Sequence, residues 1–369
     1  MGHEYEIGLS KWDLETPALL VDLDAVERNI QTMADFCRSR DIALRPHAKI
    51  YKATPAFAWM QLRAGVIGLT VAKLSEAETL ASAGIRDILI ANQVVGERKI
   101  RRLVNLAAYT DVIVGADCLD NALAISQMAS ARGVEVGILV EVNIGNNRCG
   151  TEPFEPTERL AREILKLPGL RLRGIMGYDG HLAFVADKTE QRERSLQSYR
   201  LLVEVRDYLK NSGIPVEIVS GGGTATYTYA AEVEGITELQ AGTYIFNDTT
   251  YYDNGRTDFE CVLTVLGTVI SMTEQPDGGR IAILDVGRKS FSLSYGFPRM
   301  KQPEGELFSM PQEHSRLRLK DDPCLSVGDK VEIWVKDANE TVNLYNHIYA
   351  MRGDIVEAVW DIPARGRSV

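Results

Sequence analysis

Cysteine is scarce in this sequence. The five cysteines are odd in number, widely spaced and form no C-x-x-C pair: Cys37, Cys118, Cys149, Cys261 and Cys324. A disulfide framework or a zinc ribbon would need paired or closely spaced cysteines, so neither is indicated. We interpret the cysteines as reduced and mostly structural thiols.

Long apolar runs and basic clusters are also missing. No apolar run reaches the roughly 18 residues of a membrane-spanning helix, and the first residues, MGHEYEIGLSKWDLE, lack the basic and apolar regions of a targeting signal. The 41 Lys and Arg against 51 Asp and Glu give a net charge of −10 at pH 7, and the basic run at 99–102 is short. We therefore expect a cytosolic protein that binds neither membranes nor nucleic acid.

The composition that remains is typical of a globular protein. The chain has 369 residues, of which 45% are hydrophobic and 25% charged. This length and composition predict about two domains with a large core.

Short apolar segments alternate with amphipathic helical patterns between residues 17 and 254. The predicted strands cover 18–21, 43–46, 66–70, 87–91, 111–114, 137–142, 172–176 and 216–220, with a ninth near 238–241. Repeated strand–helix units over this length indicate an α/β fold. They favour a closed (β/α)8 barrel of the TIM type over an open doubly wound sheet.

Residues after 254 have a different pattern, in which strands joined by turns replace the helices. Segments 261–272 and 280–286 flank a Pro-Asp-Gly-Gly turn at 276–279, which predicts a hairpin, and further strands are predicted near 330–334 and 354–360. We expect residues 1–16 and 255–369 to form a C-terminal β-rich domain, separate from the barrel at 17–254.

A lysine ends the second predicted strand, in Arg45-Pro46-His47-Ala48-Lys49. In an extended segment Arg45, His47 and Lys49 share one face, which in a barrel lies inside the rim that carries active sites. Burial there lowers the pKa of an amine, so Lys49 could form a Schiff base. A rim lysine paired with a carboxylate is the structural alternative, and Lys52 is the competing lysine.

Three consecutive glycines follow the eighth predicted strand, in Ser220-Gly221-Gly222-Gly223-Thr224. Without a Cβ in the way, backbone N–H groups can approach a phosphate closely. The pattern is neither a P-loop nor a dinucleotide fingerprint. Its place at a late strand end of a barrel favours a phosphate cradle over an ordinary turn.

Polar residues also follow the sixth and seventh predicted strands. Arg148 after the sixth could bind an anionic oxygen, whereas Tyr178 and His181 after the seventh could supply a hydrogen bond and proton transfer near neutral pH. Each of these residues, taken alone, is equally compatible with a structural role in its loop.

Together these segments resemble the pyridoxal-phosphate enzymes of fold type III, in the D-threonine aldolase and D-serine dehydratase branch of the alanine-racemase-type barrel. The segments that carry the resemblance occur in the family's order, at 16–29, 45–49, 72–77, 177–181, 220–224 and 239–244. Glu313-His314 and the C-terminal residues 356–367 add agreement in the second domain.

The resemblance implies a cofactor site and an assembly. Pyridoxal phosphate would be held by Lys49 through a Schiff base, with its phosphate at residues 220–224. The other residues implied at the cofactor are His47, Arg148, Tyr178, Gln240 and Tyr244. The resemblance also implies a homodimer that acts on a small amino-acid substrate.

The implied reaction is that of a carbon–carbon lyase. It cleaves the Cα–Cβ bond of a β-hydroxy D-amino acid to a simple amino acid and an aldehyde or keto acid, with His181 as the base. The alternatives are a dehydratase of D-serine or 3-hydroxyaspartate, an amino-acid racemase, and a PLP-binding protein without turnover.

The family's metal pair, His-x-Cys or His-x-Asp, is altered in this sequence. An alignment without a gap places the pair at Asp337 and Asn339, whereas a second alignment makes His347 the first ligand and Tyr349 the second. Oxygen ligands favour Mg²⁺ or Mn²⁺ over Zn²⁺. Because two side chains alone bind weakly, the resemblance leaves open whether any metal is bound.

Overall fold

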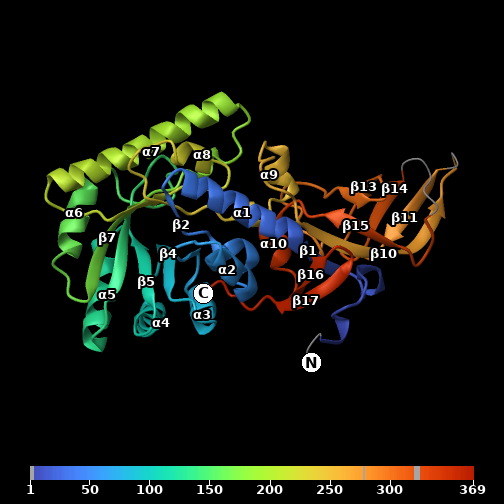
Figure 1. Cartoon of the computed structure of the whole chain (residues 1–369), viewed down its shortest axis with the longest axis horizontal. Helices are drawn as coiled ribbons and strands as arrows, with labels where there is room; N and C mark the ends of the chain where they lie inside the picture. The colour runs from blue at the N-terminus through green and yellow to red at the C-terminus, as the bar shows by residue number, and fades with distance from the viewer. Residues whose placement is uncertain (1–3, 277–278, 320–324) are drawn as a thin grey trace. The chain divides into compact units, whose positions relative to one another are not determined.

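The chain folds into two compact units (Figure 1). The computed structural model describes residues 4–276, 279–319 and 325–369, so Cys324 lies outside the described residues. The barrel unit contains Met33–Lys49, Pro55–Gly242 and Arg367–Val369, and the β-rich unit contains Met1–Thr32, Ile50–Thr54 and Thr243–Gly366. The units differ from the predicted domain ranges, because residues 17–32, 50–54 and 243–254 of the predicted barrel range belong to the β-rich unit.

Eight parallel strands form the barrel, in the order β2-β9-β8-β7-β6-β5-β4-β3. A bridge between His47 and Thr70 links the two end strands, as do hydrogen bonds from the Ile67 and Thr70 N–H groups to the carbonyls of Leu44 and Pro46. The predicted TIM-type barrel is therefore confirmed. The strands are β2 Ala43–Leu44, β3 Leu69–Val71, β4 Asp87–Gln93, β5 Asp111–Ala116, β6 Val136–Glu141, β7 Leu170–Met176, β8 Ile218–Gly221 and β9 Glu238–Leu239.

The first predicted strand forms, but in the other unit. β1, Ala18–Asp22, pairs antiparallel with β10, Leu263–Glu274, and parallel with β16, His347–Arg352. Its four leading residues are buried, a pattern that fits either sheet. The segment near 238–241, predicted as a ninth strand, takes the remaining place in the barrel as β9.

Helices alternate with the barrel strands and lie outside them in Figure 1. α4 shows why: Ile100, Leu103 and Val104 are buried at helical spacing, whereas Arg98 and Arg101 are exposed. The helices are α1 Leu23–Ser39, α2 Pro55–Arg63, α3 Leu74–Ser82, α4 Glu97–Ala107, α5 Leu119–Arg132, α6 Glu155–Ile164, α7 Lys188–Asn211, α8 Tyr227–Ala230, α9 Thr249–Asp253 and α10 Ala338–Val342. The short 3-10 helices are η1 Glu4–Glu6, η2 Lys11–Asp13, η3 Ala48–Tyr51, η4 Gly180–Leu182 and η5 Thr243–Ile245.

Side chains fill the barrel interior and separate its two ends. Leu89, Ile113, Leu139, Met176 and Ile218, one from each of five neighbouring strands, form a buried cluster. The interior is therefore a packed core, so the chemistry must lie at the strand ends.

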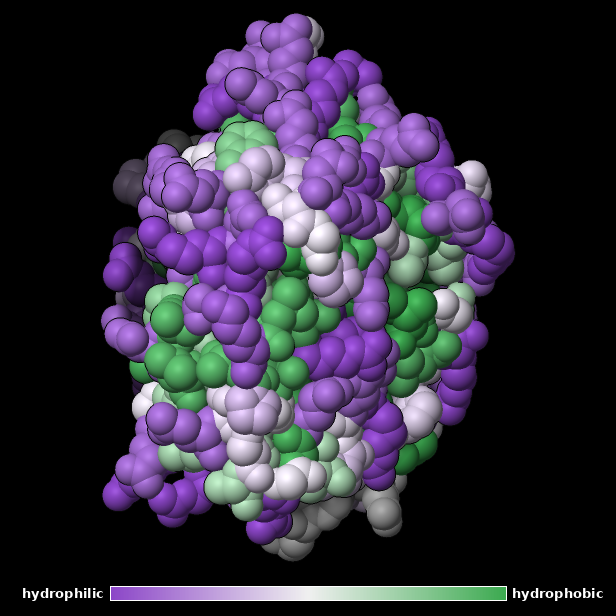
Figure 2. Space-filling view, turned by 90° about the vertical axis from the view of Figure 1, so that its left-hand side faces the viewer, coloured by the Kyte–Doolittle hydropathy of each residue, from purple (hydrophilic) through white to green (hydrophobic). Residues whose placement is uncertain are grey.

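The surface carries both polar and apolar residues. Figure 2 shows hydrophilic residues interleaved with hydrophobic ones over the face that it presents. Scattered exposed apolar side chains of this kind are normal for a globular protein. Within residues 4–276, 279–319 and 325–369, no helix has both the length and the hydropathy to cross a bilayer.

The β-rich unit contains a mixed sheet in the order β13-β14-β11-β10-β1-β16-β17. β15 also pairs with β10 in this sheet, and β12 pairs with β15. The predicted hairpin is confirmed, because β10 and β11 pair antiparallel, although Asp277 and Gly278 of its turn lie outside the described residues. The strands not yet named are β11 Arg280–Leu284, β12 Met300–Gln302, β13 Gly305–Ser309, β14 Ser315–Leu319, β15 Lys330–Trp334 and β17 Ile355–Asp361.

Candidate active site

Lys49 lies in η3, just after the short strand β2. Its backbone N–H donates to Nδ1 of His47, with 3.4 Å between the nitrogens. Burial lowers the pKa of the Lys49 amine, the guanidinium of Arg148 lowers it further, and the carboxylate of Glu76 opposes both. A larger fraction of Lys49 is therefore neutral near pH 7 than of an exposed lysine, as Schiff-base formation requires.

Arg148 and Tyr178 connect the surroundings of Lys49 to the glycine turn. The Arg148 guanidinium lies 5.7 Å from the centre of the Tyr178 ring. A Cβ added to Gly223 would stand 3.1 Å from Cε2 of that ring, so the ring covers the turn at Gly223. Arg148, Tyr178 and Gly223 thus lie in succession, and the charge of Arg148 acts on Lys49.

The glycine turn after β8 has no room for side chains. Gly222 has a φ of +79°, and a Cβ there would lie 2.8 Å from Cδ2 of Leu239. A Cβ on Gly221 would lie 2.8 Å from the carbonyl oxygen of Gly177. Among the described residues, the Gly223 N–H has no protein acceptor. A turn without room for a Cβ at any of its three glycines exposes its backbone N–H groups, as binding of the phosphate of pyridoxal phosphate requires.

A buried aspartate on the neighbouring loop holds this turn in place. Asp179 accepts hydrogen bonds from Ser195 Oγ at 3.1 Å, Tyr199 OH at 2.6 Å and Thr226 Oγ1 at 3.0 Å. Tyr199 OH in turn accepts from the N–H of Gly222 at 2.9 Å. The N–H of Gly222 is therefore used by the protein, so the groups left for a phosphate lie further along the turn.

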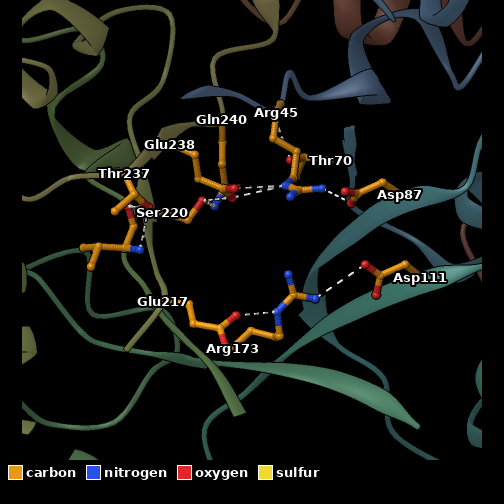
Figure 3. Close-up of polar contacts among 11 residues, drawn as sticks. Arg45, Thr70, Asp87, Asp111, Arg173, Glu217, Ser220, Thr237, Glu238 and Gln240 are labelled. Atoms are coloured by element: carbon orange, nitrogen blue, oxygen red, sulfur yellow. Dashed lines mark hydrogen bonds and ion pairs between the residues drawn. The ribbon is translucent and has the colours of Figure 1, made fainter. Parts of the chain in front are cut away.

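Ser220 and Gln240 belong to a second buried network, shown in Figure 3. Ser220 Oγ donates to Glu238 at 2.7 Å and accepts from Gln240 Nε2 at 2.8 Å. Arg45 forms ion pairs with Glu238, at 3.2 Å, and with Asp87. Burial lowers the pKa of Arg45, but the two carboxylates outweigh burial and raise it. The phosphate role of Ser220 stays a prediction, and in this structure its hydroxyl belongs to the Arg45 network.

Glu141, at the end of β6, anchors the loop that carries Arg148. Its carboxylate accepts from Gln93 Nε2 at 2.6 Å and from Cys149 Sγ at 3.1 Å, and lies 3.8 Å from the Arg148 guanidinium. Glu141, Gln93 and Cys149 were not among the site residues predicted from the sequence. The sequence does contain a signal for Glu141, because it is a carboxylate at the end of an otherwise apolar predicted strand.

His181, the predicted base, lies in η4 on the exposed side of its loop. A Cβ on Gly145 would stand 3.3 Å from its Nε2. Partial burial lowers the pKa of His181 and Arg194 adds to this, although Asp179 opposes them. The lowered pKa favours the neutral imidazole, which can accept a proton at neutral pH.

The remaining predicted residues belong to the β-rich unit. Tyr244 is fully buried there, with its ring centre 5.5 Å from that of Phe259. His347 Nε2 lies 3.2 Å from Tyr349 OH, which donates to Glu6 at 2.7 Å. His347 is thus bound to a hydroxyl in β16.

The predicted metal pair is occupied by protein donors. Asp337 caps α10 by accepting the Glu340 N–H at 3.1 Å, and its other oxygen lies 2.9 Å from Ser292 Oγ, which is also 2.6 Å from Glu340 Oε2. Asn339 Oδ1 accepts from the Lys52 ammonium at 2.7 Å. The part of the chain that the structure describes holds no group of three or more His, Cys, Asp or Glu suited to a metal. Asp337 and Asn339 therefore do not fit a divalent cation, which needs several oxygen or nitrogen ligands whose lone pairs are not already bound.

Comparison with known proteins agrees with this architecture. Residues 21–250 match the family described as alanine racemase, N-terminal domain, and residues 262–351 match the putative serine dehydratase domain. D-threonine aldolase from Arthrobacter sp. is 35% identical over 96% of this chain and 94% of its own length. 3-Hydroxy-D-aspartate aldolase from Paracoccus denitrificans is 32% identical over 98% and 94%.

Solved structures give the same relationship. The structure of D-threonine aldolase from Filomicrobium marinum matches with a TM-score of 0.93 and 34% identity, over 98% of both chains. A cysteine-to-alanine variant of D-threo-3-hydroxyaspartate dehydratase in a metal-free form matches with a TM-score of 0.85 and 26% identity, over 96% of this chain and 98% of that one. The chain therefore belongs to the fold-type III pyridoxal-phosphate enzymes with an alanine racemase N-terminal domain, in the branch that includes D-threonine aldolase.

Proposed function

We propose that this protein is a lyase that cleaves the Cα–Cβ bond of β-hydroxy D-amino acids. The observation that carries the proposal is a buried lysine, Lys49, whose pKa is lowered by burial and by the charge of Arg148, an arginine that lies over the Tyr178 ring beside the glycine turn. Aldolases with substrates of this class match nearly the whole chain. The products would be a simple amino acid and an aldehyde or keto acid.

The residues of the barrel unit would hold and orient the cofactor and substrate. Lys49 would bind the cofactor covalently through Nζ, and the turn at Gly223 and Thr224 would receive its phosphate. When bound, pyridoxal phosphate withdraws electrons from Cα, so the protein decides which bond at that atom breaks. Arg148 would place a positive charge beside the substrate carboxylate.

His181 would take the proton from the β-hydroxyl oxygen. Its lowered pKa favours the neutral imidazole near pH 7, the form that can accept this proton. Loss of that proton lets the oxygen form a carbonyl as the Cα–Cβ bond breaks. Proton transfer at the β-oxygen, rather than at Cα, would separate an aldolase from a racemase.

The products decide among the candidate functions. The purified holoenzyme should be incubated with D-threonine, D-serine and 3-hydroxyaspartate, and both aldehyde and ammonia should be measured. We expect glycine with acetaldehyde from D-threonine, or glycine with glyoxylate from 3-hydroxyaspartate. Ammonia with a 2-oxo acid would indicate a dehydratase, inversion at Cα a racemase, and bound cofactor without turnover a PLP-binding protein.

Removing the hydroxyl of Tyr199 should weaken cofactor binding. In Tyr199→Phe, the Gly222 N–H loses its acceptor and Asp179 loses one of its three hydroxyl donors. Leaving such buried groups unpaired costs about 1–3 kcal/mol, so we expect the dissociation constant for pyridoxal phosphate to rise roughly 5- to 100-fold. Titration of the apoprotein would measure this change.

Tyr208→Phe is the matched control, because Tyr208 lies on the same helix, α7, but bonds Glu158 at the surface. Cofactor binding by the control should match that of the unaltered protein. Equal affinity in both variants would show that the Asp179–Tyr199 network does not position the turn.

We also propose a homodimer, as the family resemblance implies. Tyr295 and Phe297 in the β-rich unit are 49% and 41% exposed, and burial of such aromatic side chains is typical of subunit interfaces. Sedimentation at working concentration should give twice the chain mass of 40.9 kDa. A fully active monomer would contradict the proposal.

A further inference from the structure

A lysine side chain lies against the predicted metal pair in the β-rich unit. The Lys52 ammonium donates to Asn339 Oδ1 at 2.7 Å. Glu340, next to Asn339 in the chain, accepts from Ser294 Oγ at 2.6 Å, and its Oε2 also lies 2.6 Å from Ser292 Oγ. Lys52 therefore stands among the groups that a cation at this place would contact.

The backbone holds Lys52 in an uncommon conformation. Lys52 and Ala53 have φ angles of +49° and +52°, in the left-handed region that residues with a Cβ rarely adopt. The segment is fixed on both sides: Tyr51 is fully buried, and its carbonyl accepts from the N–H and the hydroxyl of Thr54, at 3.1 and 2.7 Å. Two such residues in succession persist only where the surroundings impose them, and they cluster at functional sites.

A divalent cation and this ammonium compete for the same oxygen. A metal would need the lone pairs of Asn339 Oδ1 at about 2.0–2.6 Å, and that atom already binds the ammonium at 2.7 Å. Asp337 adds one carboxylate, of which Oδ1 accepts the backbone N–H of Glu340 and Oδ2 lies 2.9 Å from Ser292 Oγ. Two positive charges so close together would also repel.

We infer that the Lys52 ammonium supplies the positive charge that a divalent metal would otherwise bring, and that the enzyme needs no such metal. The inference rests on the proposed function for its second part, that turnover depends on the charge of Lys52 and on no divalent metal. A fixed charge of this kind acts without reorganisation when negative charge develops during a reaction.

The first test measures metal binding and needs no substrate. Elemental analysis of the purified holoenzyme should find no stoichiometric magnesium, manganese or zinc, and titration with Mn²⁺, followed by electron paramagnetic resonance, should show free ion only. A stoichiometric bound metal would overturn the inference, whatever reaction the enzyme performs.

The second test uses Lys52→Met. We expect kcat to fall about 10²- to 10³-fold, with the visible spectrum of the cofactor unchanged and partial rescue by added ethylammonium. Lys52→Arg, which keeps the charge, should retain more activity and shows whether the segment still folds. Lys289→Met is the control, because Lys289 is exposed and pairs with Glu313 at the surface.

Activity in EDTA completes the test. The unaltered enzyme should keep its full rate in EDTA and gain nothing from Mg²⁺, Mn²⁺ or Zn²⁺. Activity that EDTA removes and a metal restores would overturn the inference, as would a fully active Lys52→Met. If no substrate is cleaved, the proposed function fails, and the Mn²⁺ titration alone still decides whether the site binds metal.

Discussion

Lys49→Ala should lose essentially all turnover, by about 10⁴-fold or more, because no other group can take the covalent role of its amine. Burial and the charge of Arg148 lower the pKa of Lys49 and so prepare it for that role. Added pyridoxal phosphate could then bind only through its phosphate and ring. The visible absorption of the bound cofactor and kcat with D-threonine would measure both losses.

Lys166→Ala is the control for this variant, because Lys166 is exposed and pairs only with Glu163 at the surface. It should keep the spectrum and the rate of the unaltered enzyme. Borohydride reduction of the holoenzyme, followed by peptide mass analysis, should locate the cofactor on Lys49. A label on Lys52 or Lys73 would contradict the assignment.

Local patterns in the sequence were sufficient to predict most of the barrel. All nine predicted strand segments form strands, because short apolar runs and the helical spacing between them are local properties. The partner of a strand is not local: β1 pairs with β10 and β16, far along the chain. Its run of buried apolar residues fits a barrel strand equally well, so sequence alone could not assign it to the β-rich sheet.

The same limit applies to the candidate site. Lys49, Arg148, Tyr178 and the glycine turn were predicted from short segments at strand ends, and their roles stay predictions. Asp179 lies inside one of those segments, but its hydroxyl donors come from α7 and from the turn before α8. Convergence of distant segments on one buried carboxylate leaves no local pattern in the sequence.

The Asn339 oxygen shows how structure changes the interpretation of a motif. The family resemblance placed a metal pair at Asp337 and Asn339, and the oxygen ligands of that pair favoured Mg²⁺ or Mn²⁺ if any metal was bound. The hydrogen bond of Asn339 to Lys52, 287 residues away, could not be foreseen. The residue types Asp and Asn indicated a site for a cation. The hydrogen bond from Lys52 to Asn339 indicates that this cation is an ammonium group of the protein.

Glu238→Ala should destabilise the protein by about 3–5 kcal/mol, the cost of removing one partner from a buried ion pair. The side chains of Arg45 and Glu238 are each only 3% exposed, so Arg45 would keep only Asp87, which is 37% exposed (Figure 3). Ser220 Oγ would also lose its acceptor. Denaturant unfolding of the apoprotein would measure the change in free energy.

Glu217→Ala is the matched control, because Glu217 also joins β-strand arginines, Arg171 and Arg173, but its side chain is 49% exposed. An exposed pair contributes about 0–1 kcal/mol, since water and salt screen it. Glu238→Gln should fall between the two, because its amide oxygen can still accept from Ser220 although the charge is lost. If Glu238→Ala costs no more than Glu217→Ala, Arg45 is not held by Glu238, and the Arg45 network does not fix the end of β8 from which the glycine turn begins.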